Sequence, residues 1–124
     1  MINHVTVHVP PETLNDPALL TFMTMLRMEE VKPDDPFEHG WEVRWFKNKA
    51  AEPPAQTYLH LVAGEHMNHH GFVQDVLCLG HICIDAVEVD MVRQIARQMG
   101  WLERDSGSGR IWLNFYNLRV EVRP

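Results

Sequence analysis

The chain has 124 residues, 45% of them hydrophobic and 23% charged, which suits one domain with a buried core. Its net charge is −6 with the histidines neutral, and no cluster of Lys and Arg occurs, which argues against a nucleic-acid partner. Cys78 and Cys83 do not form a Cys-x-x-Cys pair, the N-terminus lacks a signal-peptide pattern and no apolar run reaches membrane-spanning length, so we expect a cytoplasmic protein without membrane contact.

The first half of the chain predicts one strand, one helix and three more strands. Alternation of apolar and polar residues over about 2–9 predicts the first strand. Asp16 and Pro17 are typical of a helix N-terminus, and the apolar stripe that follows predicts a helix over 17–28; its members are Leu19, Phe22, Met23 and Leu26. We then expect a short extended piece, a turn-rich stretch and two strands, at 29–32, 32–40, 41–46 and 57–63.

The second half repeats this order. A strand at 81–85 is followed by a helix over 87–99, which Gly100 ends. The apolar stripe expected on this helix consists of Met91, Val92, Ile95 and Met99. An extended piece, a turn-rich stretch and two strands follow, at 101–104, 105–109, 110–116 and 118–123. The order β-α-β-β-β therefore occurs twice, and we divide the chain into module 1 (about 1–64), a linker (about 65–79) and module 2 (about 80–124).

Four polar residues hold matching places in the two repeats. His4 lies in the first strand of module 1 and His81 in the first strand of module 2, while His60 and Glu121 lie in the last strands. Each is flanked by hydrophobic neighbours that point to the opposite face. Three imidazoles and a carboxylate suit a divalent transition metal. The chemical softness of these ligands does not distinguish among nickel, zinc, manganese and iron.

The same alternation assigns further residues to the face that would hold a substrate. By aligning the repeats we expect that face to carry a set of aromatic and polar side chains: Arg44, Phe46, Tyr58, Trp112, Asn114 and Tyr116. Arg44 is the candidate for holding an anionic group of the substrate. His8 is expected to line the pocket or its rim.

Two short segments resemble a known family. Gly80-His81-Ile-Cys-Ile is similar to the Gly-His-Ile-Ala-Phe strand of the vicinal oxygen chelate superfamily, which includes glyoxalases, bleomycin-resistance proteins and dioxygenases. The segment from Asn114 onward keeps the Arg-Val-Glu ending of the family's last strand, although it lacks the Asp-Pro and Gly before it. The resemblance covers nearly the whole chain. It implies an α+β fold in which two βαβββ modules form curved sheets, and metal ligands from the first and last strand of each module.

The resemblance also implies a metal-dependent lyase or isomerase that binds a small oxygen-bearing substrate through two oxygens, with Glu121 as the catalytic base. His60 replaces the Glu or Gln of glyoxalase I proteins, and His8 stands where they tend to carry an Arg that helps hold glutathione. Two alternatives remain open. One is a metal-free protein that binds or sequesters a small molecule such as an antibiotic. The other is an extradiol-type dioxygenase using His4, His81 and Glu121. Family members commonly pair their modules between two chains, so we expect a homodimer, with the site within one chain or shared.

Overall fold

The computed structural model describes residues 4–32, 37–38, 40–49, 56–63, 81–85, 88–107 and 109–124. The chain divides into two compact units, Met1–His66 and Met67–Pro124. These units contain the two predicted modules, and we keep the names module 1 and module 2 for them. The predicted linker, about 65–79, lies outside the described residues. None of the described helices is long and apolar enough to cross a membrane.

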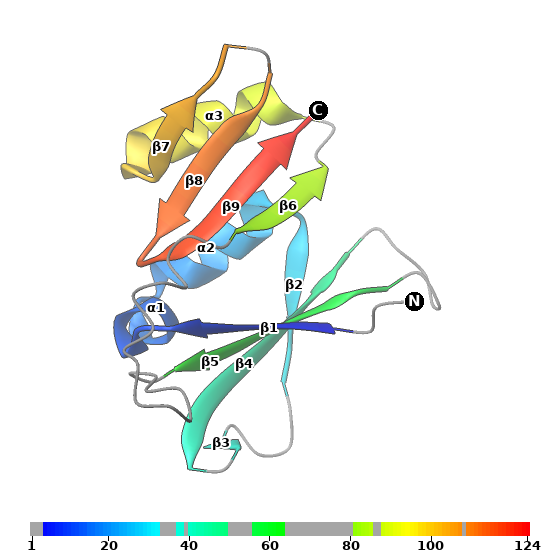
Figure 1. Cartoon of the computed structure of the whole chain (residues 1–124), viewed down its shortest axis with the longest axis vertical. Helices are drawn as coiled ribbons and strands as arrows, with labels where there is room; N and C mark the ends of the chain where they lie inside the picture. Colours follow the sequence, from blue (N-terminus) through cyan, green and yellow to red (C-terminus); the bar gives the residue numbers. More distant parts are fainter. Residues whose placement is uncertain are drawn as a thin grey trace. The chain divides into compact units, whose positions relative to one another are not determined.

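Module 1 is a sheet with two helices on one face. Its elements are β1 (His4–Val9), α1 (Pro11–Asn15), α2 (Ala18–Met25), β2 (Met28–Val31), β3 (Phe37–Glu38), β4 (Trp41–Asn48) and β5 (Tyr58–Ala63). The strands run in the order β1-β5-β4-β2, and β3 pairs with β4 (Figure 1). β1 and β5 are parallel, and the other pairs are antiparallel.

Helix α2 begins and packs as its sequence predicts. The side chain of Asp16 accepts a hydrogen bond from the backbone N–H of Ala18 at 2.8 Å, which satisfies one of the donors exposed at a helix start. All four residues of the predicted stripe are buried, and Leu19 and Phe22 are completely inaccessible. Full burial of such a side chain contributes about 1.5–3 kcal/mol. Helix α1 was not predicted, because five residues are too few for a helical period to show.

Module 2 is a second sheet with one helix. Its elements are β6 (Ile82–Asp85), α3 (Val89–Met99), β7 (Leu102–Asp105), β8 (Ile111–Phe115) and β9 (Leu118–Arg123). The strands run in the order β6-β9-β8-β7, and α3 packs against β7 and β8 (Figure 1). β6 and β9 are parallel, as β1 and β5 are in module 1.

Helix α3 buries only part of the predicted apolar stripe: Val92 is buried as predicted. Met91 and Met99 are 45% and 46% exposed, and the buried residues are Val89, Val92 and Ala96. The spacing of three and four residues still gives one apolar face. Gly100 ends the helix in the left-handed conformation with φ of 75°, and the next backbone N–H, that of Trp101, donates to the carbonyl of Ala96 at 2.8 Å. The predicted end of the helix is therefore confirmed.

The two sheets repeat the same ladder. In module 1, Thr6 of β1 and Trp45 of β4 are both registered with His60. In module 2, Cys83 of β6 and Trp112 of β8 are both registered with Glu121. Registered residues point to the same face. Each module therefore brings equivalent positions to one face of its sheet.

Asp105 at the end of β7 should make stability depend on pH. A hydrogen bond from the backbone N–H of Gly107 lowers the pKa of this carboxyl, and Arg93 and Arg97 lower it further. A pKa below the unfolded value gives stability that is present above the unfolded pKa and lost as pH falls through the folded pKa. We therefore expect Asp105→Asn to unfold at lower urea concentration at pH 7, and its deficit to shrink below about pH 4. A deficit that stays constant down to pH 3 would contradict this, and the exposed Glu88→Gln serves as the control.

Candidate metal site

In module 1, His4 and His60 lie together on the face of the sheet away from α2. Their ring centroids are 6.1 Å apart with an angle of 77° between the rings. His60 is buried with 9% of its surface exposed, whereas His4 is exposed. The parallel pairing of β1 with β5 therefore brings together these two of the four predicted ligands.

Two neighbours hold the His60 ring. The Nδ1 atom of His60 lies 3.2 Å from the hydroxyl of Thr6. The indole of Trp45 stacks on the imidazole with centroids 3.9 Å apart and planes 10° apart, and it also contacts His4 edge-on at 5.3 Å. If Nδ1 carries the proton and donates it to Thr6, the lone pair of His60 is on Nε2. Thr6 and Trp45 thus orient a ring that can offer one nitrogen to a ligand.

In module 2, His81 and Glu121 are in direct contact. The Nε2 atom of His81 lies 3.0 Å from Oε2 of Glu121, and Nε of Arg110 lies 2.9 Å from Oε1. The Glu121 residue is 7% exposed, while the side chains of His81 and Arg110 are 38% and 49% exposed. A buried carboxylate needs compensating donors, and these two side chains supply them.

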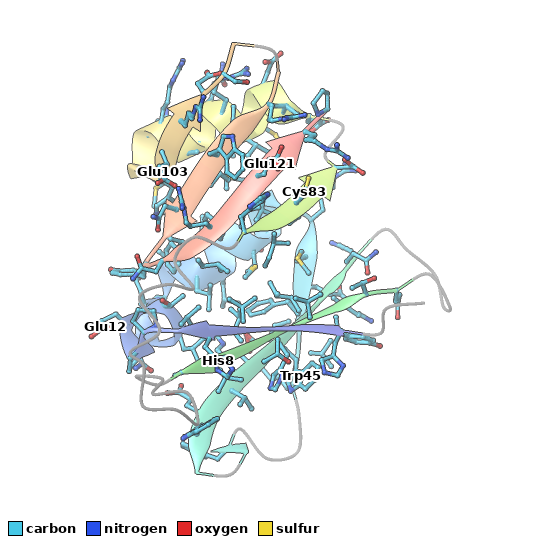
Figure 2. All side chains as sticks on the ribbon, in the orientation of Figure 1. His8, Glu12, Trp45, Cys83, Glu103 and Glu121 are labelled. Carbon is cyan, nitrogen blue, oxygen red and sulfur yellow. The ribbon has the colours of Figure 1, made fainter. Side chains whose placement is uncertain are left out.

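Cys83 completes the surroundings of Glu121. It lies on β6 beside Glu121 on β9 (Figure 2). Burial raises the pKa of the Cys83 thiol, and the charge of Glu121 raises it further against a lowering by Arg123. The thiol therefore stays protonated at neutral pH and can donate to Glu121. A protonated thiol is a poor nucleophile, so Cys83 is placed to orient the carboxylate rather than to attack a substrate.

Comparison with known proteins identifies the fold. No protein-family model matches the chain, and no curated protein matches it. Among solved structures, the fosfomycin resistance protein FosX of Listeria monocytogenes matches with a TM-score of 0.65 and 16% identity over 99% of this chain and 89% of that one. A variant of FosX in complex with Mn(II) and 1S,2S-dihydroxypropylphosphonic acid matches with a TM-score of 0.60 and 17% identity, over 99% and 88% of the two chains. The trypanothione-dependent glyoxalase I of Leishmania major matches with a TM-score of 0.62 and 14% identity, over 99% and 85%.

The chain has the vicinal oxygen chelate fold. The predicted fold class, α+β with two βαβββ modules, is confirmed. The short helix α1 and the two-residue strand β3 are additions to the pattern of module 1.

The candidate metal ligands form one pair in each module, and each pair can be compared with the spacing that a divalent ion requires. Two donors on one ion lie roughly 3 Å apart, because bonds of about 2.0–2.2 Å meet near tetrahedral or octahedral angles. The 3.0 Å between His81 and Glu121 meets that requirement. The ring centroids of His4 and His60 are 6.1 Å apart, slightly farther than those of two imidazoles that bind one ion. Within either module, the described residues form pairs and no group of three His, Cys, Asp or Glu that could hold a metal.

Replacing Thr6 should weaken metal binding without unfolding the protein. Residues that orient a ligating histidine typically account for about 10–100-fold in metal affinity. Thr6→Val keeps the shape of the side chain and removes the hydroxyl, so we expect a loss of that size in a competition titration with a chromophoric chelator. Thr6→Ser keeps the hydroxyl and should bind metal nearly as well as the wild type. Equal losses in the two variants would show that the hydroxyl does not act on His60.

Most other predicted site residues lie on the faces that carry these pairs. Tyr58 lies two residues before His60 on β5 and contacts Trp45 at 6.5 Å between ring centroids. Trp112 is registered with Glu121 and contacts His81 edge-on at 4.5 Å. Contact of these residues with a substrate stays a prediction, as it does for Asn114, whose side chain accepts from the backbone of Asn117, and for His8, whose ring packs against Trp41.

The placement of Arg44 and Phe46 on the same face was wrong. Trp45 is registered with His60, so its two neighbours point to the opposite face, where the helices pack. Arg44 donates to the Glu30 carboxylate and to the carbonyl of Leu14 in α1, and Phe46 is completely buried. Phe46 contributes instead to the lining of a hollow of about 430 Å³ between α2, β2 and β4.

The placement of Tyr116 was also wrong. Strand β8 ends at Phe115, and Tyr116 and Asn117 form a two-residue turn with φ of 45° and 67°. Positive φ at both central residues is the conformation of a hairpin turn that follows the twist of its strands. Tyr116 is 47% exposed and packs edge-on against Phe115. It therefore leaves the row of side chains that carries Trp112 and Asn114.

Two residues near the candidate ligands were not predicted. Trp45 stacks on His60, and Arg110 pairs with Glu121. Aligning Trp45 with Trp112 between the repeats would have indicated the first, because both tryptophans are registered with the second ligand of their module. The sequence holds no comparable signal for Arg110, whose counterpart in module 1 is the buried Val43.

Proposed function

We propose that this chain is a metal-dependent, glyoxalase-like lyase or isomerase that acts on a small oxygen-bearing substrate. The observation that carries the proposal is the contact between His81 and Glu121, repeated at the equivalent positions by the pair His4 and His60. The Mn(II) in the matching FosX complex supports a divalent ion for a protein of this fold. The two pairs would serve one ion of nickel, zinc, manganese or iron, either within one chain or between two chains of a homodimer.

Each residue would have a separate task. His4, His60, His81 and Glu121 would hold the ion, which supplies a Lewis acid able to polarise two substrate oxygens. Glu121 would take a proton from the substrate at a carboxylate oxygen, oriented by its neighbours His81 and Cys83. Trp45 and Trp112, which pack against the ligand histidines, would exclude water and favour a planar or apolar substrate surface.

A second candidate is a metal-free protein that binds a small molecule on the same face. One observation favours it: Arg110 already compensates the charge of Glu121 at 2.9 Å. A carboxylate matched by an arginine needs no ion to remain buried. In this case the four polar residues would bind a ligand by hydrogen bonds alone.

Elemental analysis of the protein decides between the two. The protein should be purified without a tag, a chelator or a nickel column, and then analysed before and after incubation with nickel, zinc, manganese and iron salts. About one equivalent of ion per site supports the enzyme and selects the ion for a substrate screen. Failure to retain any ion after reconstitution would remove the metal-dependent reading and leave the binding protein. Light scattering on the same sample tests the homodimer.

A further inference from the structure

We propose that Arg110 and Arg123 form a binding site for a small oxyanion next to Glu121. The proposal rests on the proposed function in one respect: the oxyanion would be part of the substrate that the Glu121 face accepts. It also makes a separate claim, that these two arginines and not Arg44 recognise negative charge.

The two arginines lie side by side at the end of the module 2 sheet. Glu121 is registered with Trp112, and the last registered pair of β8 and β9 is Ile111 with Val122. Arg110 and Arg123 are the next residues outward in this ladder. A Cβ atom built on Gly109 would lie 3.4 Å from the Pro124 side chain, so the segments before β8 and after β9 remain close beyond the last registered pair. Arg123 shares a face with Glu121, because they are two residues apart in β9.

Both guanidinium groups are accessible and only partly engaged. The side chains of Arg110 and Arg123 are 49% and 46% exposed. Arg110 uses Nε for its ion pair with Glu121. Arg123 uses Nε and Nη2 for Asp85, at 3.3 Å and 3.1 Å. Each acidic partner holds its arginine in place while leaving donors for a further acceptor.

The position of the arginines sets the size of the ligand. His81 lies two residues before Cys83, which is registered with Glu121, and Arg123 lies two residues after Glu121. His81 and the arginines therefore approach Glu121 from opposite directions along the strands. Two residues of a strand span roughly 7 Å, so a ligand of a few bonds could reach from the His81–Glu121 pair to the arginines. The fitting ligand is a small molecule that carries a carboxylate, phosphate or phosphonate a few bonds from another oxygen.

Calorimetric titration of metal-free and metal-loaded protein with methylphosphonate and with acetate tests this site. We expect Arg110→Met and Arg123→Met each to weaken binding of the preferred anion at least tenfold. Arg110→Lys should recover part of the affinity, because it restores the charge without the planar fork. Arg97→Met is the matched control, since it removes an exposed arginine of α3 that pairs with Asp105. Tighter binding of methylphosphonate would indicate a phosphate or phosphonate ligand, and tighter binding of acetate would indicate a carboxylate ligand.

The outcomes separate this proposal from the proposed function. The oxyanion site would be overturned if Arg110→Met and Arg123→Met each changed the affinity for the anion by no more than twofold. It would also be overturned if the wild type bound neither anion. Failure to take up metal would count against the enzyme only, because the titration of metal-free protein still decides the role of the arginines. If Arg44→Met lost anion binding and Arg110→Met kept it, Arg44 would be the residue that recognises the anion. That result would contradict the proposal.

Discussion

Replacing His81 with alanine should reduce metal affinity by at least about 100-fold, since a lost ligand costs more than a lost neighbour of a ligand. His81 contacts the Glu121 carboxylate at 3.0 Å and is partly exposed, so its removal takes away a donor without opening the core. We expect the variant to retain the wild-type melting temperature in the absence of metal, within a few degrees. Chelator competition for affinity and circular dichroism for folding measure the two effects separately.

His8→Ala is the matched control for this variant. His8 lies on the same strand face as His4, four residues along, but packs against Trp41 and belongs to neither ligand pair. Its removal should change metal affinity less than threefold. If His8→Ala and His81→Ala lose affinity equally, then metal is held by scattered surface histidines and not by the proposed residues.

Replacing Phe46 with alanine should destabilise the protein by about 3–5 kcal/mol, the usual range for removing a buried aromatic side chain. Phe46 is completely inaccessible on the helix-facing side of β4. The loss is a large fraction of the 5–15 kcal/mol that typically separates folded from unfolded domains. Urea unfolding followed by tryptophan fluorescence measures it.

The matched control is Phe37→Ala in β3, where the same side chain is 54% exposed. It should change stability by less than about 0.5 kcal/mol. A Phe46→Ala protein that stays as stable as the wild type but loses ligand binding would show that Phe46 lines a binding pocket, as the sequence had suggested.

The repeated order of strands and helices could be predicted from the sequence because the apolar residues of each segment recur with the period of a strand or of a helix. Alternation identified β1, β5 and β9, and the stripe of α2 with Asp16 before it located that helix closely. The face of α3 was harder to predict, since Met91 and Met99 are as apolar as the residues that are buried. Hydrophobicity alone does not decide which side of such a helix meets the sheet.

The ligand pairs were predictable and most of their surroundings were not. β4 is buried on both faces, with Val43 inaccessible on one side and Phe46 on the other, so alternation cannot show which face its other residues take. Only the register with β5 reveals that Trp45, and not Arg44, faces His60. Arg110 precedes its strand and meets Glu121 across a hairpin, a contact that no local pattern encodes.

The tryptophans give each module its own optical reporter. Trp45 stacks on His60 in module 1 (Figure 2). Trp112 packs against His81 in module 2. A bound paramagnetic ion quenches indole emission over short distances, so the emission of each tryptophan would report on the histidine beside it. The chain also contains Trp41 and Trp101, so the two reporters are separated in a protein that carries Trp41→Phe and Trp101→Phe. In that background, Trp112→Phe leaves the signal of module 1, and Trp45→Phe leaves that of module 2. Ion binding to the two modules could therefore be timed separately, which would reveal whether the two histidines meet the ion together or one after the other.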